Sequence, residues 1–191
     1  MQKIDEKWYA QDGSEIKRVV RIITIILIIA AAVWGVGLWM NAQRVPQLPG
    51  EVILKGNMSF EGADAKVQEA GYVPRSEVLQ KGSDYQRYYE SSEVFGKQTV
   101  VSTLMLIQSQ GRYVSFDHLF PEEDNQHNAE NPGPVFNAIL EELTSCIGTE
   151  PRKQKSDTNG TILFWELQEK TGVGLFYFQD NLVRVRYIYV R

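Results

Sequence analysis

Apolar and polar residues are distributed unevenly along this chain. Residues 22–40 form one uncharged run in which 16 of the 19 residues are apolar. From about residue 59 onward the chain instead alternates between short apolar runs and polar breaks. This contrast predicts an apolar helix near the N-terminus, followed by a globular domain built from shorter elements.

The first half of the globular part predicts one helix followed by three strands. Residues 62–70 carry small apolar residues at helical spacing, and Gly71 is a typical C-terminal stop. The next runs are rich in β-branched, aromatic and aliphatic residues and are separated by short glycine-containing breaks. We expect strands over residues 86–95, 99–108 and 112–120.

The second half predicts the same order of elements. Residues 121–134 read as a polar loop, and Pro134 suits the first turn of a helix that Gly148 would cap. The apolar stripe of this helix consists of Phe136, Leu140, Leu143 and Ile147. After a second polar loop over residues 150–160, we expect strands over residues 161–168, 173–178 and 182–191.

This order of elements indicates an α+β domain in which two helices cover one face of an antiparallel sheet. It also suggests two α-β-β-β units in tandem, without visible sequence identity between them. In element order, residues 59–191 resemble the tandem helix-plus-meander domains of β-lactamase-inhibitor-like proteins and outer-membrane assembly lipoproteins. The resemblance rests on the order of elements, since residues 59–191 contain no motif of either family.

The run at residues 22–40 has the length of a transmembrane helix, because 19 residues rise about 28 Å. Met40-Asn41-Ala42 has Met where a signal-peptidase site would have a small residue, so we expect an uncleaved anchor. Five Lys and Arg residues precede the run, whereas two follow within about twenty residues, which favours a cytoplasmic N-terminus.

The sequence therefore predicts four consecutive parts. Residues 1–21 would be a cytoplasmic tail and residues 22–40 the single-pass span. Residues 41–58 contain Pro46 and Pro49 and predict an extended linker or stalk. Residues 59–191 would form the extracytoplasmic domain, so the protein would be located in the cytoplasmic membrane of a cell envelope.

Charge and cysteine content narrow the classes of function. The net charge is −4, without the basic surplus of a nucleic-acid-binding protein. Residues 1–21 carry +1 and residues 41–191 carry −5. The single cysteine excludes an intramolecular disulfide, and the chain has no phosphate-binding loop or nucleophile motif. We therefore expect no cofactor and no enzymatic activity.

The last predicted strand carries the candidate partner-binding residues. Arg184 and Arg186 alternate with apolar residues and should share one face of the sheet. Arginine and tyrosine are enriched in protein interfaces, so Arg184, Arg186, Tyr187 and Tyr189 form a candidate partner-binding set. The alternative is that the aromatic residues belong to the core and the arginines to an ordinary solvated face.

A weaker candidate is a metal site, because carboxylates and imidazoles cluster between residues 117 and 127. The cluster comprises Asp117, His118, Glu122, Glu123 and His127. Its spacing matches no zinc or EF-hand pattern, and acidic loops are commonly just solvated.

These observations favour a single-pass membrane-anchored envelope protein whose outer domain binds another protein in assembly, tethering or regulation. Two alternatives stay open: a membrane-tethered sensor of a small ligand or metal, and an envelope hydrolase with a dispersed site. Ala31 and Gly35 form a small-xxx-small pair that would also allow a homodimer through the span.

Overall fold

The computed structural model describes residues 47–109, 111–122, 131–157, 160–168, 170–178 and 181–191. Contacts divide the chain into two units, Met1–Arg44 and Val45–Arg191, and the described residues all belong to the second. The predicted tail, the predicted span with Ala31 and Gly35, and residues 41–46 of the predicted linker lie outside the described residues. Among the described residues, no helix has the length and apolarity needed to cross a membrane.

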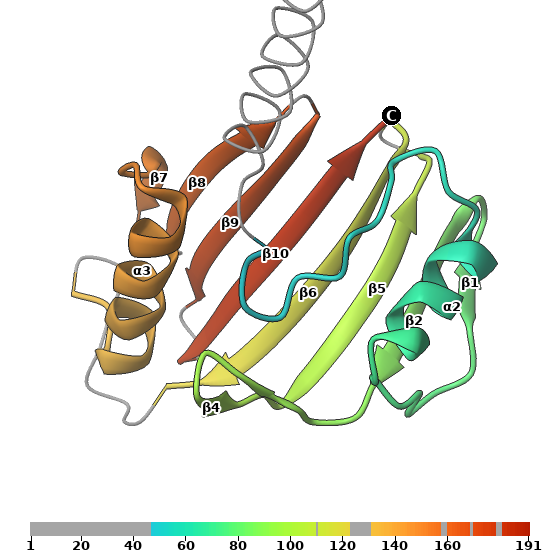
Figure 1. The fold of residues 1–191 in the computed structure, drawn as a ribbon, viewed down its shortest axis with the longest axis horizontal. Coiled ribbons are helices and arrows are strands. Elements are labelled where there is room, and N and C mark those ends of the chain that lie inside the picture. Colours follow the sequence, from blue (N-terminus) through green and yellow to red (C-terminus); the bar gives the residue numbers. More distant parts are fainter. Residues whose placement is uncertain (1–46, 110, 123–130, 158–159, 169, 179–180) are drawn as a thin grey trace, which may run out of the picture. The chain divides into compact units, whose positions relative to one another are not determined.

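The described residues form an α+β fold with one large antiparallel sheet, as the sequence predicted (Figure 1). The order across the sheet is β1-β2-β5-β6-β10-β9-β8-β7. Its strands are β1 (Leu79–Lys81), β2 (Asp84–Tyr89), β5 (Val101–Ile107), β6 (Tyr113–Pro121), β7 (Arg152–Asp157), β8 (Gly160–Gln168), β9 (Thr171–Phe178) and β10 (Leu182–Val190). A small separate hairpin pairs β3 (Glu93–Val94) with β4 (Lys97–Gln98).

The sheet consists of two four-stranded meanders that meet at its centre. Each meander follows a helix in the chain, α2 (Phe60–Glu69) or α3 (Pro134–Ile147). The halves join through β6 and β10, which pair antiparallel from Leu182↔Pro121 to Val190↔Tyr113. Each half therefore contributes four strands to the large sheet rather than the three predicted.

The two unpredicted strands of the large sheet are its edges. β1 has three residues, all exposed, and β7 has the sequence RKQKSD within the predicted loop 150–160. Neither strand shows the apolar alternation of a half-buried strand. Short length and charged side chains are also the features that protect sheet edges from pairing with other chains.

Capping residues define where α2 and α3 begin and end. Ser59 caps α2 by accepting a hydrogen bond from the Gly62 amide at 3.1 Å. α3 begins at Pro134 and ends before Gly148, whose φ of 77° is the left-handed conformation of a C-terminal cap. Their buried side chains are Phe60, Ala63, Asp64 and Val67 in α2, and Val135, Phe136, Ile139 and Leu143 in α3.

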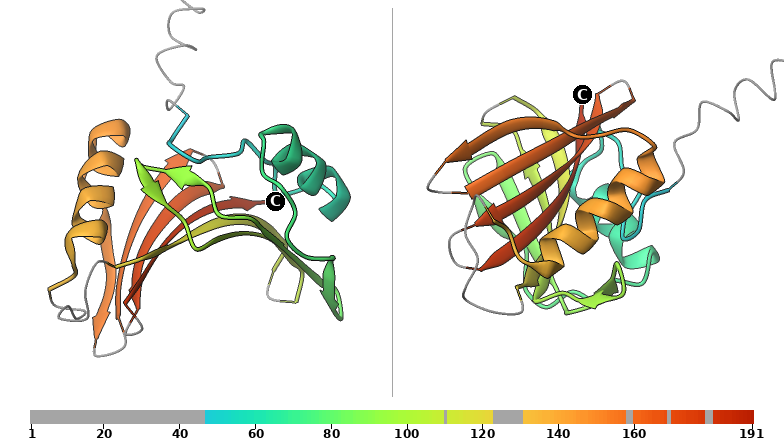
Figure 2. Two further views of the ribbon diagram at one scale, coloured as in Figure 1. Left: turned by 90° about the horizontal axis from the view of Figure 1, so that it is seen from below. Right: turned by 90° about the vertical axis from the view of Figure 1, so that its left-hand side faces the viewer.

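Both helices lie on the same side of the curved sheet (Figure 2). We call the face that carries them the helix face, which includes Val185 and Tyr187 of β10. The opposite face, which includes Arg184 and Arg186, is the open face, since no described helix or strand lies over it (Figure 2).

Residues 47–54 run across the helix face in the space between α2 and α3 (Figures 1 and 2). Leu48, Val52 and Leu54 are 2%, 5% and 3% exposed and belong to the core. The predicted linker over residues 41–58 is thus wrong for this portion, because its leucines and valine fill the gap that the helices leave on the sheet. The domain begins before Leu48 rather than at residue 59.

Candidate functional site

The predicted partner-binding set of β10 is divided between the two faces of the sheet. Arg184 and Arg186 project from the open face, whereas Tyr187 and Tyr189 are 1% and 3% exposed on the helix face. The split follows from strand geometry, because neighbouring side chains point to opposite faces.

The two tyrosines hold the 47–54 segment. Tyr187 donates its hydroxyl hydrogen to the carbonyl of Pro49, and Tyr189 donates to the carbonyl of Val52 at 2.7 Å. Burial raises the pKa of both hydroxyl groups well above their usual value, so they remain protonated donors. Their role is to anchor the N-terminal part of the domain, and they are inaccessible to a partner.

The predicted metal cluster is separated in the same way. Asp117 projects from the open face, and His118, the next residue of β6, is fully buried on the helix face. His118 Nδ1 lies 2.8 Å from Ser102 Oγ, and Nε2 lies 2.8 Å from the carbonyl oxygen of Gly50. Burial lowers the pKa of His118 to about 4, so the ring is neutral near pH 7 and serves as another anchor of the 47–54 segment.

Glu122 caps the second helix. Its carboxylate accepts hydrogen bonds from the amides of Val135 at 2.8 Å and Phe136 at 3.2 Å. These amides are among the unpaired donors at a helix start, where a negative charge is also favourable. Glu123 and His127 lie outside the described residues. Among the described residues, no group of three His, Cys, Asp or Glu side chains is placed to hold a metal ion.

The open face is centred on Asp117 and the two arginines of β10. Arg186 donates from Nε to Asp117 Oδ1 at 3.0 Å and from Nη2 to Oδ2 at 2.6 Å. Asp117 is only 4% exposed. Burial raises the pKa of its carboxyl group, and the positive charges of Arg186 and Arg184 oppose this rise. The bidentate geometry makes Arg186 part of the structure of the sheet.

Arg184 is held more loosely than Arg186. Its Nε lies 3.7 Å from Asp117 Oδ2, and its side chain is 33% exposed. Its guanidinium carbon lies 4.9 Å from the centre of the Phe178 ring, in a cation–π arrangement. The two terminal nitrogens of Arg184 make no hydrogen bond to the described residues. They are thus the donors of this cluster that remain available to a ligand.

Three phenylalanines beside these arginines, Phe164, Phe176 and Phe178, form what we call the aromatic layer. The Phe176 and Phe178 rings are stacked with centroids 6.0 Å apart and planes 1° apart, and Arg186 lies over Phe176 at 5.6 Å. A β-carbon at Gly172 would fall 2.3 Å from the Phe164 ring, and one at Gly174 would fall 2.6 Å from the Phe176 ring. The glycines of β9 therefore leave the space in which the rings lie against the sheet.

Large half-buried side chains continue over the rest of the open face. Alternation and strand pairing place on this face Tyr88, Met105, Ile107, Tyr113, Leu119, Ile162, Leu182 and Ile188. A depression of about 370 Å³ lies at its β1 end, with Leu79, Met105 and Ile107 among its lining residues. Partly exposed apolar side chains gathered on one sheet face are a typical feature of a binding surface.

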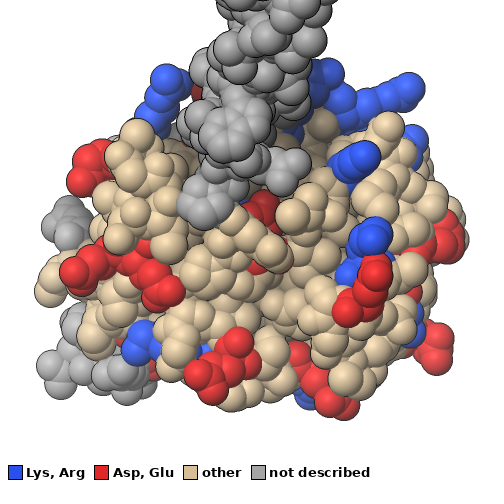
Figure 3. Space-filling model, viewed as in Figure 1, with Lys and Arg blue, Asp and Glu red and all other residues tan. Residues whose placement is uncertain are grey.

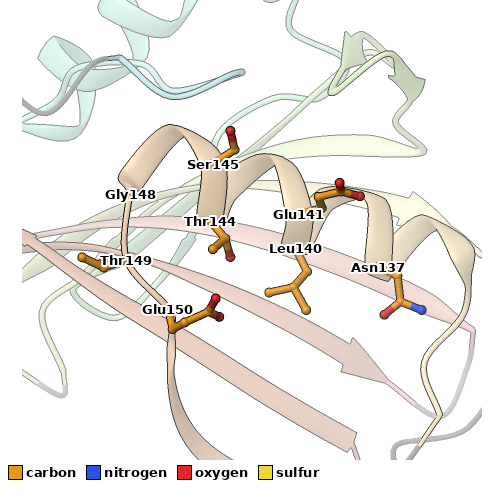
Figure 4. Close-up of a pocket in the computed structure, with 8 residues that line it drawn as sticks. All are labelled: Asn137, Leu140, Glu141, Thr144, Ser145, Gly148, Thr149 and Glu150. Carbon is orange, nitrogen blue, oxygen red and sulfur yellow. The ribbon is translucent and has the colours of Figure 1, made fainter.

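The helix side has fewer features of a binding surface than the open face. In the space-filling view from this side, most basic side chains lie along the upper edge of the domain, and most acidic side chains lie at its sides and lower edge (Figure 3). A shallow depression of about 620 Å³ follows the outer side of α3, where Glu141 and Glu150 are spread apart rather than convergent (Figure 4). The described residues that line it include no Lys, Arg or His. The described side chains of this depression form no acid–base or nucleophile arrangement.

Comparison of the chain with protein-family models, with curated proteins and with solved structures finds no match. The resemblance in element order noted above therefore stays a prediction.

Proposed function

We propose that this chain is a membrane-anchored protein-binding module of a cell envelope and that its domain binds another envelope protein through the open face. The observation that carries the proposal is the bare face of the eight-stranded sheet, with its aromatic layer and its arginines. The apolar run at residues 22–40 and the charge bias around it support the single-pass, N-in topology.

The open face has the composition of a protein interface. Phe176 and Phe178 offer rigid apolar area, and Arg184 offers directional hydrogen bonding with little loss of side-chain freedom. Half-buried side chains gain from being covered, because each 100 Å² of apolar surface removed from water contributes about 2.5 kcal/mol. A non-catalytic role in assembly, tethering or regulation fits this surface better than an active site.

Photo-crosslinking in living cells tests the binding function. The photoreactive amino acid p-benzoylphenylalanine would replace Tyr88 or Phe178 on the open face of the full chain, or Glu69 on α2 as the control. We expect one discrete crosslinked band from the two open-face positions and none from Glu69. Equal bands from all three positions, or bands from none, would contradict the proposed function.

The topology is tested separately with external protease on spheroplasts. We expect the domain to be degraded while the N-terminal tail is protected. A protected domain would place the binding face in the cytoplasm and overturn the envelope location.

A further inference from the structure

The charge of the open face points to the chemistry of its partner. Among the described residues, Arg184 and Arg186 share one carboxylate, Asp117, so this central cluster of three side chains carries a net charge of +1. The domain around it is acidic, since residues 41–191 carry −5. A positive centre within an apolar face favours a partner that brings a negative group to that point.

Arg184 has the geometry of a carboxylate receptor. Its guanidinium carbon lies 4.9 Å from the centre of the Phe178 ring, and the nitrogen nearest Asp117 is Nε at 3.7 Å. The two terminal nitrogens remain unpaired among the described residues. A planar fork with free donors binds a carboxylate in a bidentate manner, and the supporting ring reduces the side-chain entropy lost on binding.

The depression beside β1 supplies a second contact point. Leu79, Met105 and Ile107 supply its apolar part, and Leu79 is 51% exposed; Gln80, Lys81, Asp84 and Gln86 also line it. Strand pairing connects Met105 to Ser115 and Ile188, and connects Arg184 to Leu119 and Val101. The spacings of a β-sheet then put roughly 15 Å between Arg184 and Met105, which an extended chain of about four or five residues would span.

We propose that the open face binds an extended acidic segment of the partner protein. A carboxylate of that segment pairs with Arg184, and an aliphatic side chain about four or five residues away fills the depression beside β1. This inference rests on the proposed protein-binding function and adds the chemistry and spacing of the bound segment.

A lipid surface fits the same face less well. One net positive charge contributes only about 1 kcal/mol at an anionic membrane. A second copy of the domain would bring two positive clusters together. An acidic peptide segment is thus the occupant that the charge and shape of the face favour.

A library of random twelve-residue peptides displayed on phage is the probe for this inference. The full chain would be kept in a mild detergent and immobilised through an N-terminal tag. We expect the enriched peptides to carry Asp or Glu about four or five positions from Leu, Ile, Val or Met. Enrichment of peptides without this acidic–aliphatic pair, or no enrichment over the bare support, would overturn the inference.

Three variants locate the binding. We expect Arg184→Glu to lower retention of the enriched peptides at least tenfold, and Leu79→Ser to lower it several-fold. Arg75→Glu, which reverses an exposed charge in the loop between α2 and β1, should leave retention unchanged. Raising NaCl from about 0.05 to 0.5 M should weaken binding, because salt screens a partly exposed ion pair.

The outcomes separate this inference from the function on which it rests. If enriched peptides bind equally well to Arg184→Glu, the acidic-segment inference is wrong and the protein-binding function stands. If no peptide is enriched and the chain instead binds vesicles containing phosphatidylglycerol, or self-associates through the open face, both are wrong.

Discussion

The helix face and the open face of the sheet use tyrosine, phenylalanine and charged side chains in different ways. On the helix face, Tyr187, Tyr189 and His118 are buried, and each hydrogen-bonds to a main-chain carbonyl of residues 49–52. On the open face, Phe176, Phe178 and Arg184 remain half-exposed, and the terminal donors of Arg184 have no described partner. The helix face, where these polar groups are buried and hydrogen-bonded, stabilises the fold. The open face, where these side chains are only partly covered, is the face available for binding.

The largest expected effect on stability comes from Arg186, and it should exceed the effect of Arg184, the other arginine of the open face. Arg186→Glu would place a second carboxylate beside the buried Asp117, and we expect a loss of about 3–5 kcal/mol of unfolding free energy. Arg184→Ala should cost less than about 1 kcal/mol, because its ion pair is longer and more exposed. Urea unfolding of a chain starting at Val45 would measure both. Equal costs would mean that the two arginines do not differ in role.

The 47–54 segment tests whether the helix face is completed by residues outside the predicted domain. Leu48→Ala should destabilise the domain by about 2–4 kcal/mol, because it opens a cavity in the core. Its matched control is Ile53→Ala, since Ile53 is 66% exposed and should cost less than about 0.5 kcal/mol. Thermal and urea unfolding would both report the difference. If both substitutions lowered the unfolding free energy by similar small amounts, the segment would be a linker and not part of the core.

The anchoring histidine should make the stability of the helix face depend on pH. The pKa of His118 is about 4 in the folded chain and about 6.5 when unfolded, so the unfolded state takes up the proton first as pH falls. This contribution is complete above about pH 6.5 and is lost toward pH 4, by about 3 kcal/mol. His118→Gln should remove that part of the pH dependence, while His127 is present in both proteins. If the unfolding free energy of the original chain and of His118→Gln changed equally with pH between 7 and 4, His118 would not be neutral and buried in the folded chain.

The smallest expected effect concerns the aromatic layer of the open face. Gly174→Ala places a methyl group against the Phe176 ring and should cost about 1 kcal/mol, because the ring must move. In a protein that already carries Phe176→Leu, adding Gly174→Ala should cost much less stability, because the ring that the methyl group would meet is absent. Unfolding midpoints of the four proteins form a double-mutant cycle. Additive effects would mean that the glycine does not seat the ring.

Much of the fold could be predicted from local pattern, because most strands of the sheet are half-buried and alternate visibly. The sequence TILFWELQ of β8 shows this, whereas RKQKSD of β7 does not, since an edge strand is specified mainly by its neighbour. The 47–54 segment was also missed as part of the core, because its anchors Tyr187 and Tyr189 lie more than 130 positions away in the chain.

The candidate site was only partly predictable for a similar reason. Alternation correctly placed Arg184 and Arg186 together, and the same alternation implies that Tyr187 and Tyr189 face the other way. Asp117 was assigned to a metal cluster, because its pairing with Arg186 depends on the β6–β10 register, which no local pattern reveals. Glycines at positions 172 and 174, among strand phenylalanines, were the available signal for the aromatic layer.

Hydroxyl-radical footprinting of the full chain tests the central claim, that the open face is covered by a partner, most directly. Oxidation of Tyr88, Met105 and Phe178 would be compared between native membranes and the purified chain, with Ile53 and Leu140 as reporters on the helix side. We predict several-fold protection of the three open-face residues in native membranes and unchanged oxidation of the two helix-side residues. Equal oxidation of the open-face residues in both samples, or protection confined to the helix side, would contradict the account.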